Sequence, residues 1–319
     1  MSPRPIRTAL VGCGGWGRNL LREIARHPEA ELVAVVDPHP AAQARALSLA
    51  PSVEIDARLS DALRRGIDAV VIASPPEWHA EHALAALRAG AHVLVEKPLT
   101  TDASAAAELL LHSRRSGRIA MVGHVMRYHP AVTRLLSLVR QGALGSIRHG
   151  FSTRRSSRPD DGHIIWELAP HDLSLWRAMT SAPIMRVEVT HLDDNQAAVR
   201  VESETQLCCH VELSRAEGAR ERRFTLVGER GLVVFDDGGS RPSLRLFEKA
   251  IPSVNEPAAL DAFLAENRRS FVDLPFEPAQ PLALELDHFF TCIRTGRSPE
   301  TGFDEGAEVA RVLHQALVR

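Results

Sequence analysis

Three glycines near the start of the chain are followed, twenty residues after the last of them, by an aspartate. They are Gly12, Gly14 and Gly17, and the aspartate is Asp37. Gly12 allows a tight turn after a strand, Gly14 allows the backbone to approach a pyrophosphate, and Gly17 allows the following helix to pack closely. A carboxylate at the position of Asp37 can accept hydrogen bonds from ribose hydroxyls. The spacing therefore predicts a dinucleotide-binding loop.

Two further side chains are of types that move protons. His171 has an unperturbed pKa near neutrality and could act as a base, and Lys97 could donate to a hydroxyl or a developing alkoxide. Glu167 lies four residues before His171, so in a helix the two side chains share one face. The alternatives are structural: His171 as a core histidine, Lys97 in a salt bridge with Glu96, and Glu167 in a surface ion pair.

The elements around the glycines form one complete βαβ unit. Residues 6–11 read as an apolar strand, residues 19–26 carry an apolar stripe at helical spacing, and residues 31–37 read as a second buried strand. This context makes the glycine pattern more specific than it would be alone.

The same alternation of strands and helices continues to about residue 123. We expect strands at 68–73, 92–95 and 119–122 and helices at 78–89 and 103–116. Near-continuous apolar strands separated by helices indicate a parallel sheet covered on both faces, which binds ligands at the carboxyl ends of its strands. The polar residues at those ends are Asp37, Ser74, Glu96, Lys97 and His124.

The pattern changes after residue 123. A helix at 130–141, a strand at 146–153 and a helix at 164–179 precede strands at 185–192, 197–202, 205–214, 222–227, 231–235 and 244–247, and helices at 282–294 and 305–318 end the chain. Consecutive strands indicate a mostly antiparallel sheet. The predicted fold class is α/β, with an N-terminal Rossmann doubly wound parallel sheet at 1–123 and an α+β domain with a large, mostly antiparallel sheet at 124–319.

Composition excludes several classes of protein. The 319 residues carry a formal net charge of −2, which gives no reason to expect a nucleic acid partner. No apolar run reaches the roughly 18 residues of a membrane span, and we see no signal-peptide core. The four cysteines form no CxxC pair, so we expect neither disulfides nor a metal site. These features indicate a cytoplasmic protein without membrane partners.

Six segments together resemble the glucose-fructose oxidoreductase, inositol dehydrogenase and rhizopine-catabolism family of dehydrogenases over essentially the whole chain. They are the glycine segment 11–19, Ser-Pro-Pro-Glu-Trp-His at 74–79, Glu-Lys-Pro at 96–98, the segment 122–128, Glu-Leu-Ala-Pro-His-Asp at 167–172, and the C-terminal segment from Phe289 to Gly296 with the acidic helix after it. The family usually has aspartate where this chain has Glu167, which leaves the role of that carboxylate open.

The resemblance implies site residues. The implied catalytic residues are Lys97, His171 and Glu167. The resemblance does not decide whether Lys97 or His171 carries the proton. Pro98 is expected in a cis bond. The implied cofactor contacts are Gly12, Gly14, Gly15, Trp16, Gly17, Asp37, Ser74, Pro75, His79, Glu96 and Lys97. The implied substrate contacts are Lys97, His124, Arg127, Arg155, Glu167 and His171.

The expected cofactor is NAD. A carboxylate at Asp37 repels the 2′-phosphate of NADP, and the next residues, Pro38 and His39, are not the arginine that often binds that phosphate. Arg154, Arg155 and Arg158 fall in a predicted loop, where they either bind an anionic substrate such as a nucleotide-linked sugar or form a solvated loop, and we favour the solvated loop.

The expected function is hydride transfer between nicotinamide and a secondary carbinol or ketone of a sugar, cyclitol or sugar derivative. The alternatives are an NAD(P)-binding sensor or regulator without turnover, and an imine or aldehyde reductase on the same fold. Retention of Lys97 and His171 argues against the sensor. The resemblance also implies a homodimer or homotetramer.

Overall fold

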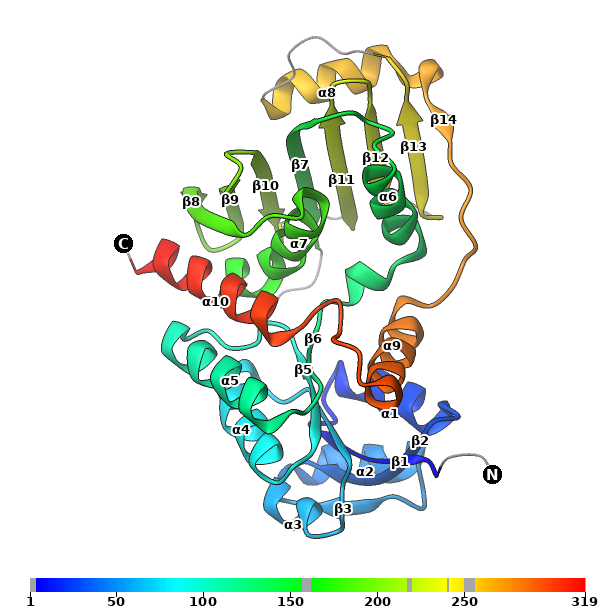
Figure 1. Ribbon diagram of the computed structural model, residues 1–319, viewed down its shortest axis with the longest axis vertical. Helices are drawn as coiled ribbons and strands as arrows, with labels where there is room; N and C mark the ends of the chain where they lie inside the picture. Colours follow the sequence, from blue (N-terminus) through cyan, green and yellow to red (C-terminus); the bar gives the residue numbers. More distant parts are fainter. Residues whose placement is uncertain (1–3, 157–161, 217–219, 240, 250–255, 319) are drawn as a thin grey trace. The chain divides into compact units, whose positions relative to one another are not determined.

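The chain folds into two compact units (Figure 1). The computed structural model describes residues 4–156, 162–216, 220–239, 241–249 and 256–318. Unit 1 comprises Met1–Val125 and Gln280–Arg311, and unit 2 comprises Met126–Ala279 and Val312–Arg319. The division predicted from the sequence, 1–123 and 124–319, differs because it assigns residues 280–311 to the second domain.

Unit 1 contains a six-stranded parallel sheet in the order β3-β2-β1-β4-β5-β6. The strands are β1 (Ile6–Val11), β2 (Ala30–Val36), β3 (Glu54–Asp56), β4 (Ala69–Ile72), β5 (His92–Glu96) and β6 (Ala120–Gly123). This is the doubly wound order, which reverses direction between β1 and β4. The carboxyl ends of those two strands are therefore where a dinucleotide is expected.

Helices cover the sheet of unit 1. They are α1 (Gly17–Arg26), α2 (Pro40–Leu49), α3 (Leu59–Leu63), α4 (His79–Arg88), α5 (Ala103–Ser116), α9 (Pro281–Thr295) and the start of α10 (Phe303–Leu317). Alternate strand residues such as Val11, Ile72 and Val95 share one core with α4, α5 and α10. Near-continuous burial of β4 and β5 is what a parallel sheet covered on both faces requires.

Local contacts explain why residues 280–311 belong to unit 1. The ring of Phe290 on α9 lies 4.7 Å from that of His27, which follows α1. Arg294 donates from Nε to Glu29 at 2.6 Å. Thr301 donates from Oγ1 to the carbonyl of Val122 on β6 at 2.8 Å. The apolar stripe of α9 therefore packs against α1, a tertiary contact that periodicity alone does not assign to either domain.

Unit 2 contains an eight-stranded sheet in the order β14-β13-β12-β11-β7-β10-β9-β8. The strands are β7 (Ile147–Arg155), β8 (Ile184–Leu192), β9 (Gln196–Ser203), β10 (Cys208–Ser214), β11 (Glu221–Gly228), β12 (Leu232–Asp236), β13 (Ser243–Phe247) and β14 (Val272–Asp273). All described pairings are antiparallel except that of β7 with β10. The prediction of a large, mostly antiparallel sheet is confirmed.

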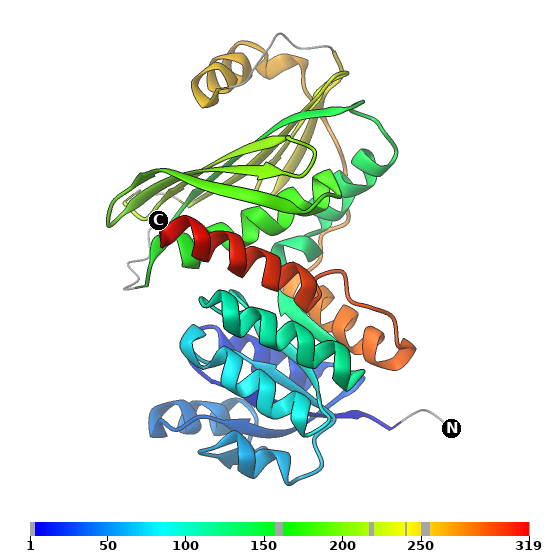
Figure 2. The same ribbon diagram turned by 60° about the vertical axis from the view of Figure 1, so that its left-hand side comes forward.

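Helices lie on both faces of this sheet (Figure 2). One face carries α6 (Pro130–Arg140) and α7 (Ile164–Thr180), and α8 (Pro257–Glu266) lies on the other. Alternation along β7 explains the sorting, because Phe151 packs with Leu260 of α8 whereas Ser152 donates to Asp172 of α7 at 2.8 Å. A Cβ added at Gly150 would lie 2.6 Å from the Trp176 ring, so glycine permits the close approach of α7.

The predicted strands and helices of both units are present within a few residues of the predicted bounds. The elements α2, β3, α3, α8 and β14 were not predicted. In the described ranges, no helix is long and apolar enough to span a membrane.

Candidate active site

The glycine loop after β1 is held by close backbone contacts. Gly12 has a φ of +89°, which favours glycine, and a Cβ there would lie 2.5 Å from the Ala73 carbonyl oxygen. A Cβ at Gly17 would lie 2.1 Å from the Gly12 carbonyl oxygen, so Gly17 closes the turn on itself. Gly14 and Gly15 are exposed, with no atom within 4 Å of an added Cβ. The loop thus has two tight positions and two open ones.

The start of α1 has free hydrogen-bond donors. Its first turn carries no acidic side chain and receives no side-chain capping bond. Within the described chain, no hydrogen bond uses the backbone N–H groups of Gly14, Gly15 or Trp16. Unsatisfied N–H groups at a helix start bind anions, so this loop fits the pyrophosphate of a dinucleotide.

The Asp37 carboxylate is fixed beside the loop by two backbone N–H groups, those of Cys13 and His39. Its Oδ2 accepts from the Cys13 N–H at 2.9 Å, and its Oδ1 accepts from the His39 N–H at 2.9 Å. The side chain is buried, and each oxygen retains a further lone pair for a hydroxyl. Arg45 of α2 donates to the Cys13 carbonyl at 2.7 Å, which places a cation near this carboxylate.

His79 ties two loops of the site together. Its Nε2 lies 2.7 Å from the Ser74 carbonyl oxygen and its Nδ1 lies 2.8 Å from the Pro98 carbonyl oxygen. The ring is almost fully buried, and burial lowers its pKa. The Lys97–Pro98 peptide is cis, as expected. His79 therefore joins the loop after β4, where Pro75 is exposed, to the loop after β5.

Glu96 and Lys97 lie at the carboxyl end of β5. The Trp16 indole N–H donates to Glu96 Oε1 at 2.5 Å, and the Lys97 backbone N–H lies 3.3 Å from Oε2. Burial raises the pKa of Glu96 to about 7, while the Trp16 bond and the Lys97 charge oppose that rise. Lys97 itself is half-buried. The site therefore contains a carboxyl group that titrates near neutrality.

A second buried carboxyl acts on the same site. Glu285 of α9 is fully buried, and neither carboxyl oxygen has a hydrogen-bond partner in the described part of the chain. Its pKa is raised by burial and by the charge of Glu96. A neutral Glu285 is the form that such an environment stabilises.

In unit 2, α7 carries His171 and Glu167 one turn apart, as predicted. Glu167 forms an ion pair with Arg215, with Oε2 2.6 Å from Nη2, and the Arg215 side chain is almost fully buried. The alternative of an ion pair for Glu167 is thus what the structure shows, although the pair is not a surface one. His171 is half-buried.

The expectation of an arginine loop is wrong for Arg154 and Arg155, which end strand β7. Arg154 is buried and donates twice to Asp172 of α7, from Nε and Nη2 at 2.9 Å. Arg155 is partly exposed and pairs with Glu221 at 3.2 Å. Arg158 lies outside the described residues. The strand continues through the charged residues because a buried carboxylate neutralises the first of them.

Two predicted substrate contacts are buried. His124, which follows β6, is 1% exposed. Arg127 is 7% exposed, and its Nη1 lies 3.5 Å from the Ser174 carbonyl of α7. Arg127 therefore lies against the helix that carries His171, where it can support that helix.

Three residues beside the candidate residues are not predicted from the sequence: Arg45 and Glu285 in unit 1 and Arg215 in unit 2. Arg45 lies on α2, whose alanine-rich sequence has little amphipathic periodicity. Arg215 and Glu285 are charged residues that fold into the interior, and residue type alone predicts exposure for both. The only available signal was for Glu285, which falls among apolar positions of a predicted helix.

Comparison with known proteins agrees with this geometry. Residues 6–124 match the model of an oxidoreductase family with an NAD-binding Rossmann fold. A 4-carboxy-2-hydroxymuconate-6-semialdehyde dehydrogenase of Sphingobium is 24% identical over 98% of this chain and 98% of the relative. A UDP-N-acetylglucosamine 3-dehydrogenase of Acidithiobacillus ferrooxidans is 33% identical over 56% of this chain and 55% of the relative, about half its length.

A solved structure of the UDP-N-acetylglucosamine 3-dehydrogenase from Acidithiobacillus ferrooxidans has the same fold. Its TM-score is 0.83 at 22% identity, and the match covers 99% of this chain and 98% of the other. The fold is thus shared over both units, while the family match lies in the first. The family model thus matches residues 6–124 alone, as an oxidoreductase with an NAD-binding Rossmann fold.

Proposed function

We propose that the protein is an NAD(H)-dependent oxidoreductase that transfers a hydride between nicotinamide and a secondary carbinol or ketone of a sugar, cyclitol or sugar derivative. The observation that carries this proposal is the Asp37 carboxylate, fixed by two backbone N–H groups beside an open glycine loop. The bound nicotinamide supplies the hydride acceptor or donor, and the protein orients it.

NAD is the proposed cofactor. A buried Asp37 carboxylate repels the 2′-phosphate of NADP, and its free lone pairs suit ribose hydroxyls. Arg45 favours a phosphate through its charge, but one of its N–H groups is already donated to the Cys13 carbonyl. The Asp37 effect is therefore expected to dominate.

Lys97 and His171 are the proposed proton-handling residues. Lys97 follows β5, and its ammonium group would donate to the substrate hydroxyl and stabilise a developing alkoxide. His171 would accept the hydroxyl proton, which is worth about 10²–10⁴-fold in rate for a positioned base. Glu167, already paired with Arg215, is proposed to hold the α7 segment in place rather than to touch the proton.

An anionic group is the proposed feature of the substrate. The names of both relatives describe anions, a carboxylated semialdehyde and a nucleotide sugar. In unit 2, burial lowers the pKa of the Arg222 guanidinium to about 10. The charge of nearby Arg154 contributes to this lowering. Their carboxylate neighbours are Asp172 and Asp237. An anion would relieve the repulsion between these two guanidinium groups.

The protein is further proposed to be cytoplasmic and to form a homodimer or homotetramer. The sheet of unit 2 gives a physical reason for assembly, because among the described residues α8 packs only against the part of one face that contains β7 and β11–β13. On β9, the residues of that face, such as Ala198 and Arg200, stay partly exposed. A second copy could cover this face.

Substitution of the two proton-handling residues tests the proposal. Lys97→Ala should reduce turnover by at least about 10³-fold and leave NAD affinity within about threefold, since electrostatic donors act mainly on the transition state. His171→Asn should lower the turnover rate by about 10²–10⁴-fold, the usual contribution of a positioned base. Lys249→Ala, an exposed lysine of unit 2, is the matched control. A cofactor-binding sensor would be favoured if the wild type shows no turnover and Lys97→Ala loses NAD binding.

A further inference from the structure

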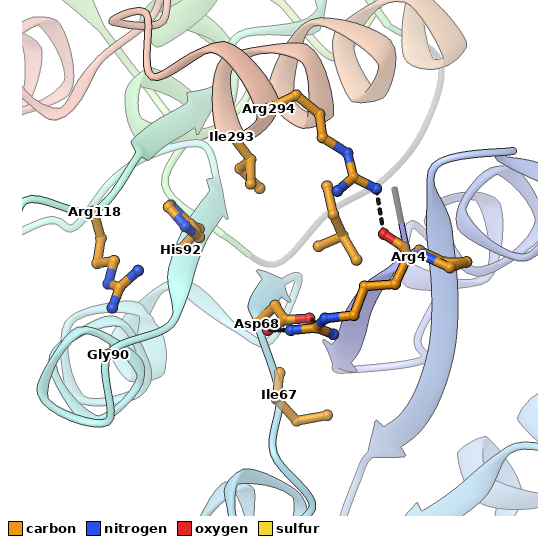
Figure 3. A pocket seen from close by; sticks show the side chains of 10 residues that line it. Arg4, Ile67, Asp68, Gly90, His92, Arg118, Ile293 and Arg294 are labelled. Carbon is orange, nitrogen blue, oxygen red and sulfur yellow. Dashed lines mark hydrogen bonds and ion pairs between the residues drawn. The ribbon is translucent and has the colours of Figure 1, made fainter. Parts of the chain in front are cut away.

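A cavity of about 250 Å³ lies at the amino ends of the strands of unit 1, the opposite ends from the glycine loop (Figure 3). It is lined by residues that precede or begin β1, β4, β5 and β6, together with two residues of α9. The proposed function does not use these residues. Their apolar members include Ile67 and Ile293, and their cationic members are Arg4, Arg118 and Arg294.

Two of the three arginines are already neutralised. Arg4 donates to both carboxylate oxygens of Asp68 at 2.8 Å, which holds the pKa of Asp68 below its usual value. Arg294 donates to Glu29 and to the Arg4 carbonyl, each at 2.6 Å. The backbone N–H of Arg7, on β1, also donates to Asp68 at 2.9 Å. The charges of Arg4 and Arg294 are therefore balanced by those of Asp68 and Glu29.

Arg118, the third arginine of the cavity, has no such ion pair among the described residues. Among the residues that the structure describes, no carboxylate or carbonyl accepts from its guanidinium group. The group lies over Gly90, where an added Cβ would be 3.6 Å from Nη2. Arg118 is exposed, so the cavity has one cation at its solvent-facing edge whose charge no ion pair among the described residues compensates.

His92 supplies a neutral donor to the same cavity. The Ile119 backbone N–H donates to its Nδ1 at 2.9 Å, so the ring proton belongs on Nε2. Burial, and secondarily the charge of Arg118, lowers the pKa of His92, so the ring is neutral at pH 7. No partner for Nε2 exists in the described ranges.

We propose that this cavity binds a small organic acid, whose carboxylate is held by the Arg118 guanidinium and the His92 Nε2–H and whose apolar body rests against Ile67 and Ile293. A single uncompensated charge suits a monoanion better than a phosphate dianion. A guanidinium fork matches the two oxygens of a carboxylate. The volume suits a body the size of one ring. The site is independent of the proposed function.

Calorimetric titration of the full chain with benzoate tests this site, with benzamide as the uncharged probe and phenyl phosphate as the dianionic one. We expect benzoate to bind, benzamide to bind at least about tenfold more weakly, and saturating NAD to leave benzoate affinity unchanged. Absence of benzoate binding, displacement of benzoate by NAD, or phenyl phosphate binding tenfold more tightly than benzoate would each overturn the assignment.

Matched variants locate the binding. Arg118→Gln should weaken benzoate at least about tenfold, and His92→Asn, whose amide oxygen can still accept from the Ile119 N–H, should also weaken it. Arg115→Gln removes an exposed arginine of α5 that does not line the cavity, and should leave the affinity unchanged. Equal weakening by Arg115→Gln and Arg118→Gln would mean a diffuse charge effect and no site.

Discussion

The Trp16 indole N–H donates to the Glu96 carboxylate at 2.5 Å, and this bond joins the glycine loop after β1 to the strand end that carries Lys97. Trp16 is 41% exposed, whereas Glu96 is 7% exposed, so the bond reaches from the surface of the loop into the interior. The proposed cofactor site and the proposed catalytic lysine are thereby mechanically linked within unit 1.

The buried Glu96 predicts a pH-dependent stability. Its pKa rises from 4.5 to about 7 in the folded state, so the folded protein binds this proton more tightly than the unfolded chain. The stabilisation is complete below about pH 4.5 and is lost as pH rises through about 7, by about 3 kcal/mol in total. Urea unfolding across this range should show the free energy of unfolding of the wild type fall by about 3 kcal/mol relative to that of Glu96→Gln, whose side chain does not titrate.

Trp16→Phe provides the control for that titration. The indole bond favours the ionised carboxylate, so its removal should raise the pKa of Glu96 further and move the loss of stability to higher pH. A Trp16→Phe profile that coincides with the wild type would show that the bond does not act on Glu96.

Gly14 and Gly17 should respond differently to alanine. Gly17→Ala places a Cβ 2.1 Å from a backbone oxygen and should destabilise unit 1 by several kcal/mol, roughly the cost of forced repacking. The Cβ of Gly14→Ala meets no atom within 4 Å, so the unfolding free energy should stay nearly unchanged. The added methyl group should weaken NAD binding, because it occupies the space through which the backbone approaches the pyrophosphate. Denaturant unfolding and NADH fluorescence titration measure the two effects, and equal stability losses would refute this assignment.

Asp37 predicts the nicotinamide preference. NAD should bind at least about tenfold more tightly than NADP, and Asp37→Ser should narrow that ratio because it removes the carboxylate near the 2′ position. Asp37→Ser should also weaken NAD itself, since the Cys13 and His39 N–H groups lose their acceptor. Titrations with NADH and NADPH give both ratios, and equal affinities in the wild type would contradict the prediction.

The Arg154–Asp172 pair should be needed for the stability of unit 2. Both side chains are at least 94% buried, so removal of either one leaves an uncompensated charge in the interior. Asp172→Asn or Arg154→Met should cost about 3–5 kcal/mol of unfolding free energy, and the double variant Arg154→Met/Asp172→Leu should recover much of it. Chemical unfolding of the three variants measures these changes. A loss of less than about 1 kcal/mol of unfolding free energy in both single variants would contradict the prediction.

Much of the fold follows from local patterns in the sequence. Apolar strands such as β4 and β5 are distinct because both faces are buried, and α5 is bounded by Asp102, whose side chain caps the helix, and by Gly117 at its end. The Gly12 turn was recognisable because only glycine suits a φ of +89° there.

The remaining features depend on contacts between distant residues. Arg154 reads as a surface charge until Asp172, eighteen positions later, is placed beneath it. Glu285 reads as a charged residue among apolar helix positions, and its burial becomes clear only when α9 is packed on unit 1. In both cases the sequence shows the charge but not the burial, and burial is what sets the stability and the pKa of these groups.

Hydride transfer can be measured by the single-turnover absorbance of reduced nicotinamide. Purified protein with NAD would be mixed with a panel of cyclitols, sugars and nucleotide sugars, and protein with NADH with the corresponding ketones. We expect an absorbance change with one class of substrate, and we expect Lys97→Ala to show no such change although it still binds NAD. Tight NAD binding with no absorbance change in either direction would contradict hydride transfer and support a cofactor-binding sensor.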